Sequence, residues 1–469
     1  MDDITSQLKR DRRVKVSGCD LDGITRGKII IKDKFLKSMD PGLGFCDVIF
    51  GWDINDRVYD SGTTAVSNAQ EGFADVIAKI DPTSYRRIPW EANIPHFLVD
   101  FHSPISNKPL SQCPRGQLKR VIAEFDALGL KPMCGMEYEF YCFKETPDSL
   151  EAKKCVNLKT IDPGMFGYSF IRPTLHQNWY YEIYDKLLEY GIPLEGWHTE
   201  TGPGVYEAAI QYSEALLLAD RSHLFKTCIK QLSLKHGIIP SFMAKPFADQ
   251  PGCSGHIHIS LTNTKTEVNT FVAPDWEHYL NDKTGLQRCS DIMKCFLAGL
   301  IEGIPSIMPC LAPTVNSYKR LVPNFWAPVT VSYGFENRTA SIRIIGPPSG
   351  GPGSTRIELR IAGADANPYL ALAAALACGL RGVRKRLELP FPPASGDESQ
   401  NTSANVKRGG GLPKNLKEAT DLMMAEGSIA REVLGDEFVN HYGATRRSEW
   451  SLWERAVTNW ELQRYLEAV

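Results

Sequence analysis

The sequence predicts an α+β fold with two domains, a small β-rich unit followed by a larger unit of helices and strands. The chain has 469 residues, more than one compact core usually organises. Hydrophobic residues make up 43% and charged residues 23%, the balance of a globular protein. We expect a domain boundary near residue 110, with an N-terminal domain of residues 1–110 and a second domain of residues 111–469.

The N-terminal domain is predicted from two strand-like runs in VKVSGCDLDGITRGKIII, which starts at Val14. Asp22 and Gly23 lie between the runs, and an Asp-Gly pair favours a tight hairpin turn. The β-rich unit ends in the loop HSPISNKPLSQCPRG, where Pro and Ser cluster before a helical pattern begins at Gln117.

The second domain alternates helical segments with short strands that carry charged residues on one face. Residues 117–128 and 214–236 predict helices, and residues 395–411 predict a polar loop before the chain returns to helix. This alternation is typical of an α+β domain.

Composition argues against several functional classes. The formal net charge is only -2 and no long basic run occurs, so the electrostatic footprint of a nucleic-acid binder is missing. The first residues lack the apolar segment of a secretory signal, and the apolar stretch 370–380 is too short to span a bilayer. The 12 cysteines are scattered without the spacing of a zinc site, as in a reducing compartment. We therefore expect a cytoplasmic enzyme with small-molecule substrates and no nucleic-acid or membrane partner.

Three strand-like segments place charged or polar residues at every second position. These residues are Glu137 and Glu139 in MCGMEYEF, His256, His258 and Ser260 in GCSGHIHISL, and Arg356, Glu358 and Arg360 in STRIELRI. Because side chains alternate across a strand, each set lies on one face and apolar residues lie on the other. One such strand could equally be an exposed edge with solvated side chains. The repetition of the pattern favours a site.

A further pair of carboxylates, Glu200 and Glu207, flanks a Gly-Pro-Gly turn in HTETGPGVYEAAI. Taken alone, this segment is an ordinary surface loop. If it meets the charged strands, five glutamates and a histidine gather in a partly dry cavity, where uncompensated carboxylates cost free energy. Divalent cations remove that cost, and oxygen-rich ligation without thiolate suits Mg²⁺ or Mn²⁺ better than Zn²⁺.

Arginines provide the complementary signal, because Arg320, Arg338 and Arg343 follow in NSYKRL and FENRTASIRI. Guanidinium groups beside metal-binding carboxylates suit phosphoryl transfer from a nucleotide, although surface ion pairs explain any one of them equally well. The chain has no GxxxxGK[ST] loop, so nucleotide binding cannot depend on a P-loop. The segment GPPSGGPGS, residues 346–354, is either a loop over the phosphates or a simple connector.

Seven segments together resemble the glutamine synthetase superfamily, type I, and occur in its order. They are EYEF, HTETGPGVYE, FMAKPF, SGHIHISL, NSYKRL, NRTASIR and RIELR. The resemblance extends from about residue 15 to the C-terminus. It implies an N-terminal β-grasp domain and a catalytic α/β domain with a curved antiparallel sheet. It also implies homo-oligomeric rings, most commonly a dodecamer of two stacked hexamers, with active sites between neighbouring subunits.

The resemblance also assigns roles to matching residues. The implied metal ligands are Glu139, Glu200 and Glu207 for one Mg²⁺ or Mn²⁺ ion, and Glu137, His256 and Glu358 for another beside the ATP phosphates. The implied substrate-binding residues are Arg320, Arg360, Trp326 and Gly252, and the nucleotide-binding residues are His258, Ser260, Arg343 and Arg356. Arg338, Arg360 and Asp56 are the implied catalytic residues, and His198 matches without an assigned role.

Two departures from the family pattern concern the amine that accepts glutamate. Trp326, in NFWAP, stands where glutamine synthetases carry a flap glutamate of the ammonium site, and an indole face binds alkylammonium groups instead. The family's FDGSS-like segment is also missing. GWDINDRVYD leaves Asp53 and Asp56 as candidates for the aspartate offered to a neighbouring subunit, with Asp56 the closer match. The ending SEWSLWERAVTNWELQRYLEAV resembles that of the γ-glutamylpolyamine and γ-glutamylamine synthetase branch.

These observations predict an ATP-dependent ligase that forms a γ-glutamyl amide from glutamate and an amine, a polyamine or another alkylamine, through γ-glutamyl phosphate. One alternative is a glutamine synthetase that uses ammonia, against which Trp326 argues. Another is a non-catalytic structural paralogue, against which the complete set of six metal ligands argues.

Overall fold

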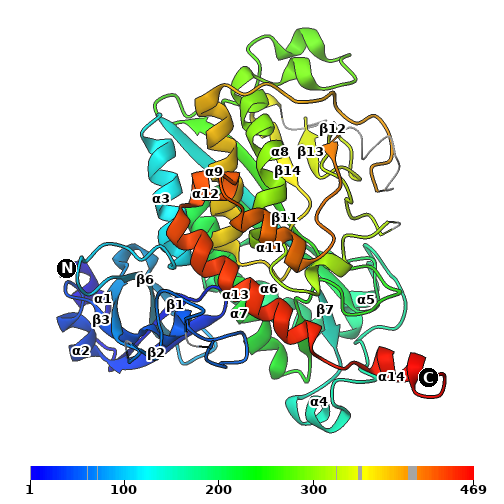
Figure 1. Cartoon of the computed structure of the whole chain (residues 1–469). Helices are drawn as coiled ribbons and strands as arrows, with labels where there is room; N and C mark the ends of the chain where they lie inside the picture. The colour runs from blue at the N-terminus through cyan, green and yellow to red at the C-terminus, as the bar shows by residue number, and fades with distance from the viewer. Residues whose placement is uncertain (1, 61, 71, 324, 347–350, 400–408) are drawn as a thin grey trace.

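A computed structural model of the chain describes residues 2–60, 62–70, 72–323, 325–346, 351–399 and 409–469 (Figure 1). It contains a six-stranded sheet in the N-terminal part and an eight-stranded sheet in the larger part, both flanked by helices. The predicted α+β class is therefore confirmed. Parts of the two predicted loops 346–354 and 395–411, namely residues 347–350 and 400–408, lie outside the described residues.

The N-terminal sheet is a curled layer with strand order β2-β1-β6-β4-β3, and β5 pairs with β6. Strands β1 (Arg13–Cys19) and β2 (Thr25–Ile31) form the predicted antiparallel hairpin, with Gly23 at a φ of 82° in its turn. β1 runs parallel to β6 (Ile94–His102). The remaining elements are α1 (Asp2–Gln7), α2 (Lys32–Lys37), β3 (Leu43–Cys46), β4 (Asp75–Ile80) and β5 (Arg86–Ile88).

The larger sheet has the order β12-β13-β14-β11-β7-β9-β8, and β10 pairs with β7. Its strands are β7 (Leu130–Phe143), β8 (Leu194–Thr199), β9 (Val205–Glu214), β10 (Ile239–Ser241), β11 (Gly255–Asn263), β12 (Tyr333–Phe335), β13 (Ile342–Ile345) and β14 (Arg356–Leu359). All described pairings are antiparallel except β12 with β13, which is parallel. The sheet is thus mixed rather than wholly antiparallel. A three-residue edge strand such as β12 is too short to carry a periodic pattern, so its direction could not be predicted.

Helices cover the apolar face of this sheet and leave its polar face open. Tyr138 of β7 stacks on Phe225 of the sheet-covering helix α7 at 5.9 Å between ring centroids, and Ile257 and Ile259 of β11 are fully buried. The longer helices are α3 (Pro114–Asp126), α6 (Gln177–Glu189), α7 (Ala215–Leu234), α8 (Asp291–Leu311), α9 (Pro368–Lys385), α11 (Leu416–Met424) and α13 (Asp436–Glu454). The shorter ones are α4 (Pro147–Lys153), α5 (Arg172–Leu175), α12 (Ile429–Leu434) and α14 (Asn459–Tyr465).

Among the described residues, α8 is the one helix long and apolar enough to cross a membrane. It begins where Ser290 accepts a hydrogen bond from the Met293 N–H, and it packs along α9. Residues 370–380, the apolar stretch noted in the sequence, lie within α9, which does not meet the same criteria of length and apolarity. Because 72% of its apolar window is buried inside the protein, α8 is a core helix.

A buried arginine joins the N-terminal part to the larger part. Arg115 of α3 is 3% exposed and makes ion pairs with Asp81 (2.7 Å), Asp100 (2.9 Å) and Asp220 (2.9 Å). Asp81 and Asp100 belong to the N-terminal part, whereas Asp220 lies on α7. One guanidinium group therefore neutralises carboxylates from both parts of the chain.

Replacing Arg115 by Met should destabilise the protein, because three largely buried carboxylates lose their shared partner. Breaking a buried ion pair from one side costs about 3–5 kcal/mol, which denaturant unfolding or the thermal midpoint would report. Lys417→Met is the control, since Lys417 pairs with Asp421 at 2.9 Å on the surface and such pairs contribute about 1 kcal/mol or less. Equal losses in the two variants would contradict this account of Arg115.

Candidate functional site

The polar face of the larger sheet forms the floor of a cavity of about 1280 Å³. All six predicted metal ligands line it, namely Glu137, Glu139, Glu200, Glu207, His256 and Glu358. Arg320, Arg338, Arg343, Arg356 and Arg360, together with Gly252, His198, His258 and Trp326, also line it. A hollow of about 310 Å³ adjoins the cavity and includes Ser260. The structure therefore gathers residues that are up to 223 positions apart in the chain, from Glu137 to Arg360, around one space.

Strand register explains why the carboxylates meet. Glu139 of β7 lies opposite Glu207 of β9, and on the other side of β7 Glu137 lies opposite His256 of β11. One strand further, His258 lies opposite Glu358 of β14. Residues that face each other across paired strands point to the same side of the sheet, so these acidic and imidazole groups form one row.

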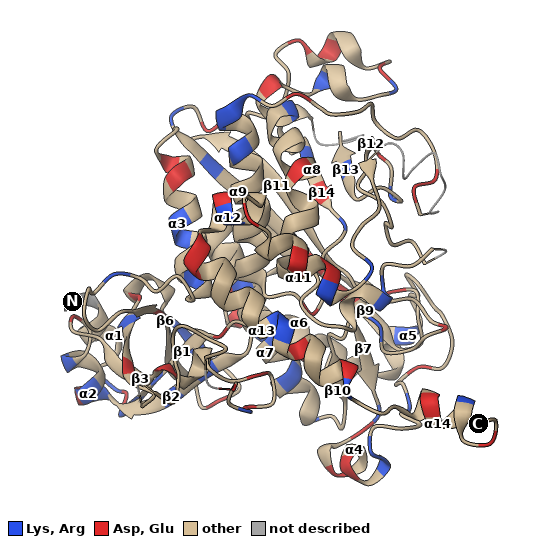
Figure 2. Ribbon diagram, in the orientation of Figure 1, with Lys and Arg blue, Asp and Glu red and all other residues tan. Residues whose placement is uncertain are grey.

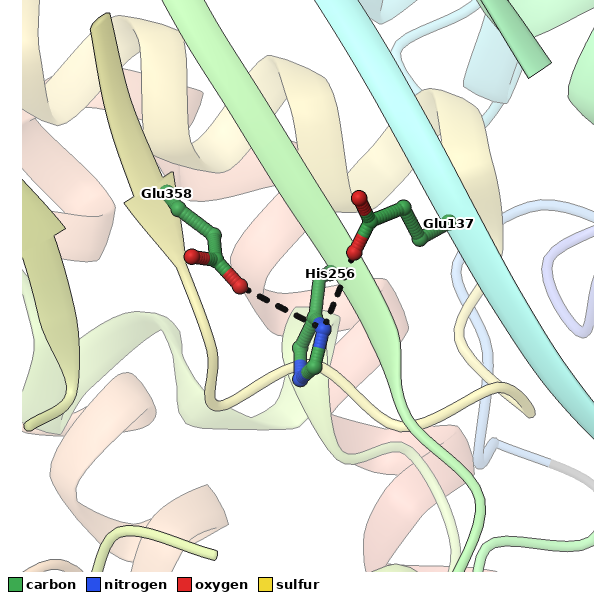
Figure 3. Close-up of side chains that lie close together, drawn as sticks. All are labelled: Glu137, His256 and Glu358. Atoms are coloured by element: carbon green, nitrogen blue, oxygen red, sulfur yellow. Dashed lines mark hydrogen bonds and ion pairs between the residues drawn. The ribbon is translucent and has the colours of Figure 1, made fainter. Parts of the chain in front are cut away.

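One candidate metal centre consists of Glu137, His256 and Glu358 (Figure 3). The His256 Nδ1 atom lies 3.4 Å from Glu137 Oε2 and 3.4 Å from Glu358 Oε1, so both carboxylates point at one imidazole. Burial alone would raise the pKa of Glu358, but His256 and Arg360 lower that pKa to about 2. This centre is therefore anionic at neutral pH.

A second group of possible ligands consists of His198, Glu200 and Glu207, whose ligand atoms lie within 4.8 Å of one another. The sequence assigned Glu139 to this centre and left His198 without a role. In the structure Glu139 Oε2 accepts a hydrogen bond from the Ser254 N–H at 2.7 Å, and His198 takes the place beside the two carboxylates. Glu139 still lines the same cavity and lies opposite Glu207 across the paired strands.

The electrostatics of Glu207 test whether a cation fits this site. Burial and the charges of Glu139, Glu137, Glu200 and Glu358 raise the pKa of Glu207 to about 9. The negative charge of the carboxylates at this end of the cavity is therefore not compensated by nearby positive groups. Carboxylate and imidazole donors without a described cysteine in the lining are the ligands that Mg²⁺ and Mn²⁺ accept, so the residues fit divalent cations.

Two buried arginines lie at the glutamate end of the predicted site. Arg320 donates to the carbonyl oxygens of Arg360 (3.3 Å), Ile361 and Ala362 (3.1 Å), and Arg360 pairs with Glu358. Within the described part of the chain, the Nε atoms of Arg320 and Arg360 have no hydrogen-bond partner. Gly252 allows Arg320 to lie so close, because a Cβ atom at residue 252 would be 2.5 Å from Arg320 Cγ. Unpartnered buried donors of this kind suit the carboxylates of a bound substrate.

The predicted nucleotide-binding residues lie on the other side of the first metal centre. His258 Nε2 is 3.1 Å from Glu137 Oε1, and Arg356 Nε donates to His258 Nδ1 at 3.2 Å. Ser260 lies with His258 and Arg356 in the adjoining hollow. Arg343 lines the main cavity but not the adjoining hollow, and it donates to Glu358 Oε2 at 3.1 Å.

The remaining predicted residues lie at the rim or outside it. Arg338 and Trp326 are exposed and line the cavity; Trp326 is 68% exposed and has a φ of 57°, the left-handed region. Asp56 is exposed, forms an ion pair with Arg26 at 2.7 Å, and does not line the cavity of its own subunit. Its role toward a neighbouring subunit stays a prediction. Sequence reasoning missed Tyr168, whose ring stacks on His198 at 4.4 Å, because no periodic pattern marks its loop.

Comparison with known proteins shows which family the chain belongs to. The sequence profile of the glutamine synthetase catalytic domain matches residues 111–465. The chain belongs to the glutamine synthetase family. It is therefore an ATP-dependent ligase of the glutamate–ammonia or glutamate–amine type.

Relatives within the glutamine synthetase family differ in the acceptor that their names state. The chain is 44% identical to the type-1 glutamine synthetase 2 of Dictyostelium discoideum over 469 residues, which cover 99% of the chain and 86% of the relative. It is 32% identical to the glutamate–isopropylamine ligase of a Pseudomonas species over 457 residues, 97% of the chain and 95% of the relative. The solved structure of a GmaS/ADP complex superposes with a TM-score of 0.81 at 26% identity, covering 99% of this chain and all of that one.

Binding of Mn²⁺ should release a proton and should tighten as the pH rises. The pKa of Glu207 is about 9 in the cation-free protein, so this carboxyl is protonated at neutral pH and must ionise to become a ligand. Affinity should therefore increase from neutral pH up to about pH 9 and level off above it. Calorimetry in two buffers of different ionisation enthalpy measures the proton count. Glu207→Gln should abolish the release, and proton-neutral binding to the unmodified chain would refute the assignment.

Proposed function

We propose that the protein joins the side-chain carboxylate of glutamate to an amine larger than ammonia, at the expense of ATP, inside a homo-oligomeric ring of the dodecameric kind. The observation that supports the proposal most is the row of acidic and imidazole side chains beside Arg320 and Arg360, two buried arginines with unpartnered donors. The rim of the same cavity carries the indole of Trp326 instead of a carboxylate. The Pseudomonas relative named as a glutamate–isopropylamine ligase supports an alkylamine as acceptor.

Glutamate would bind between Arg320 and Arg360. Both residues are buried and line the cavity, and the Nε atom of each has no hydrogen-bond partner among the described residues. Their charges orient the two carboxylates of the substrate and place the side-chain carboxylate toward Glu358 and the metal centres.

ATP would place its phosphates between the sheet and the arginines of the cavity. His258, Ser260 and Arg356 line the adjoining hollow and suit the nucleoside part, whereas Arg343 and Arg338 suit the phosphate that is transferred. Two Mg²⁺ or Mn²⁺ ions, held by Glu137, His256 and Glu358 and by Glu139, Glu200 and Glu207 with His198, would supply charge neutralisation for the phosphates. The residues position the glutamate oxygen in line with the phosphate, which forms γ-glutamyl phosphate and ADP.

The amine would enter at the rim, where Trp326 and Tyr168 line the cavity. An alkylamine has a pKa of about 10 in water, so a group at the site must accept a proton before the nitrogen attacks the acyl phosphate. Asp56 is the proposed acceptor and reaches the cavity from a neighbouring copy of the chain. The attack forms the amide bond and releases phosphate.

A glutamine synthetase that uses ammonia is the second candidate, and the 44% identity to the type-1 glutamine synthetase 2 of Dictyostelium favours it. The indole at residue 326 favours the amine, because its exposed face binds an alkylammonium group and not a small hydrated ion. A purely structural role is disfavoured because every predicted metal ligand lines the cavity.

Removing the Glu358 side chain should abolish the reaction. Glu358 is both a proposed ligand of the first metal centre and the ion-pair partner of Arg343 and Arg360, so one substitution removes both functions. We expect Glu358→Ala to lower kcat for ADP formation by about a thousandfold or more, the order of effect for a group that organises charge in the transition state. Glu302→Ala serves as the control, since Glu302 pairs with Arg381 outside the cavity. Near-normal turnover of Glu358→Ala would end the metal assignment.

A panel of ammonia, methylamine, isopropylamine, ethanolamine and putrescine, with product mass as the readout, tests the acceptor. The unmodified chain should prefer an alkylamine to ammonia, and Trp326→Glu should shift the ratio of kcat/KM toward ammonia by about twofold to thirtyfold, the range of one cation–π contact. Trp460→Glu is the matched control, because Trp460 of α14 is similarly exposed (61%) and does not line the cavity. A preference for ammonia in the unmodified chain would favour the second candidate.

A further inference from the structure

Glu336 lines the cavity without a role predicted from the sequence, and both of its carboxylate oxygens accept hydrogen bonds. Oε2 accepts hydrogen bonds from Arg343 Nε at 3.1 Å and from Arg343 Nη2. Oε1 accepts from the Gly346 N–H at 3.1 Å. The carboxylate therefore binds one side of the Arg343 guanidinium group and, at the same time, the backbone just beyond β13.

The backbone directs Glu336 toward this contact. Glu336 follows β12, and its N–H donates to the Ile344 oxygen of β13 at 2.9 Å. Its φ of 50° lies in the left-handed region, which an L-residue enters only at a cost in free energy. Strained residues of this kind persist where the surrounding structure defines their conformation, and they gather at functional sites.

Arg343 is shared between two carboxylates. While its Nε side binds Glu336, its Nη1 donates to Glu358 Oε2 at 3.1 Å. The other oxygen of Glu358 pairs with Arg360. The side chain of Glu358 is only 2% exposed, so both guanidinium groups act on it with little screening by water.

These contacts set up a competition for the charge of Arg343. Without Glu336, the Nε side of Arg343 would lose its partner and the whole guanidinium group could turn toward Glu358. Glu358, already paired with Arg360, would then be neutralised more completely and would have less charge to offer a cation. We propose that Glu336 is a positioning residue that binds the Nε side of Arg343 and thereby preserves Glu358 as a ligand for a divalent cation. The inference rests on the proposed function, in which Glu358 binds one of the metal ions.

The chain contains a matched control for this arrangement. Arg381 also lies between two glutamates, with Nη1 2.7 Å from Glu302 and Nε 2.9 Å from Glu432. Arg381 and Arg343 have equally exposed side chains (13%), and Glu302 (36%) matches Glu336 (35%). None of the three residues of the Arg381 group lines the cavity. Glu302→Gln therefore removes a carboxylate of the same kind and exposure without touching the site.

Titration of the full-length protein with Mn²⁺ alone, followed by the electron paramagnetic resonance signal of free Mn²⁺, tests the inference. Glu336→Gln should raise the Kd for Mn²⁺ at the centre that contains Glu358 by about threefold to tenfold. This is the effect expected from one partly exposed charge acting through an ion pair. Glu302→Gln should leave the Kd unchanged, and Glu336→Asp, which retains the charge, should recover most of the affinity. The Asp variant also decides the matter if the Gln variant folds poorly.

The Arg343→Gln background separates positioning from a direct charge effect. If Glu336 acts through Arg343, adding Glu336→Gln to Arg343→Gln changes the Kd no further. The inference is overturned if Glu336→Gln and Glu302→Gln behave alike, or if the Glu336→Gln effect persists at full size without Arg343. Failure of the unmodified chain to bind Mn²⁺ at all would instead overturn the proposed function, and the role of Glu336 with it.

Discussion

Repulsion among carboxylates gathered on one face of the larger sheet is the constraint on which the rest of the site depends. Strand pairing places Glu139 against Glu207 and puts Glu137 and Glu358 on either side of His256. Like charges in this arrangement would separate if the strands could move. They cannot, because the opposite face is packed into a fully buried core under helices such as α7 and α8.

Positive charge is distributed unevenly along this row. Glu358 has Arg343, Arg360 and His256 beside it, and its pKa falls to about 2 despite burial. Glu207 has mainly carboxylates around it, and its pKa rises to about 9. The protein therefore compensates one end of the site with its own side chains and leaves the other end to external cations. The two metal centres should consequently differ in how strongly their occupancy depends on pH. Figure 2 shows that acidic and basic residues are otherwise interspersed over the chain, so this imbalance is local.

Much of this site could be predicted from the sequence because its geometry is periodic. An alternation of period two is sufficient to place Glu137 with Glu139, and His256 with His258, on one face. The hairpin at Gly23 and the core helices follow from equally local signals. The family resemblance then predicted that segments far apart in the chain form one site, which local patterns alone could not predict.

The features that escaped prediction depend on long-range register or on single unusual backbone angles. His198 joins Glu200 and Glu207 only because β8 pairs with β9 in one particular register. Glu336 contacts Arg343 from a left-handed backbone conformation. Glutamate rarely adopts this conformation, so the residue type does not predict it. Tyr168 likewise has a positive φ, of 53°, in an irregular loop. Asp56 was predicted from the resemblance, and its proposed role toward a second copy of the chain stays a prediction.

The rim of the cavity and the candidate metal ligands are positioned by different parts of the structure. Phe325 is held from beneath by Lys245, whose Nζ lies 3.7 Å from the ring centroid and donates to the Gln250 oxygen at 2.6 Å. The next residue, Trp326, takes the left-handed conformation that turns the chain and leaves the indole exposed over the cavity. None of these rim residues contributes to either group of metal ligands. Because the rim residues are separate from both groups of candidate metal ligands, which strand register positions, a substitution at residue 326 should alter the rim without disturbing those ligands.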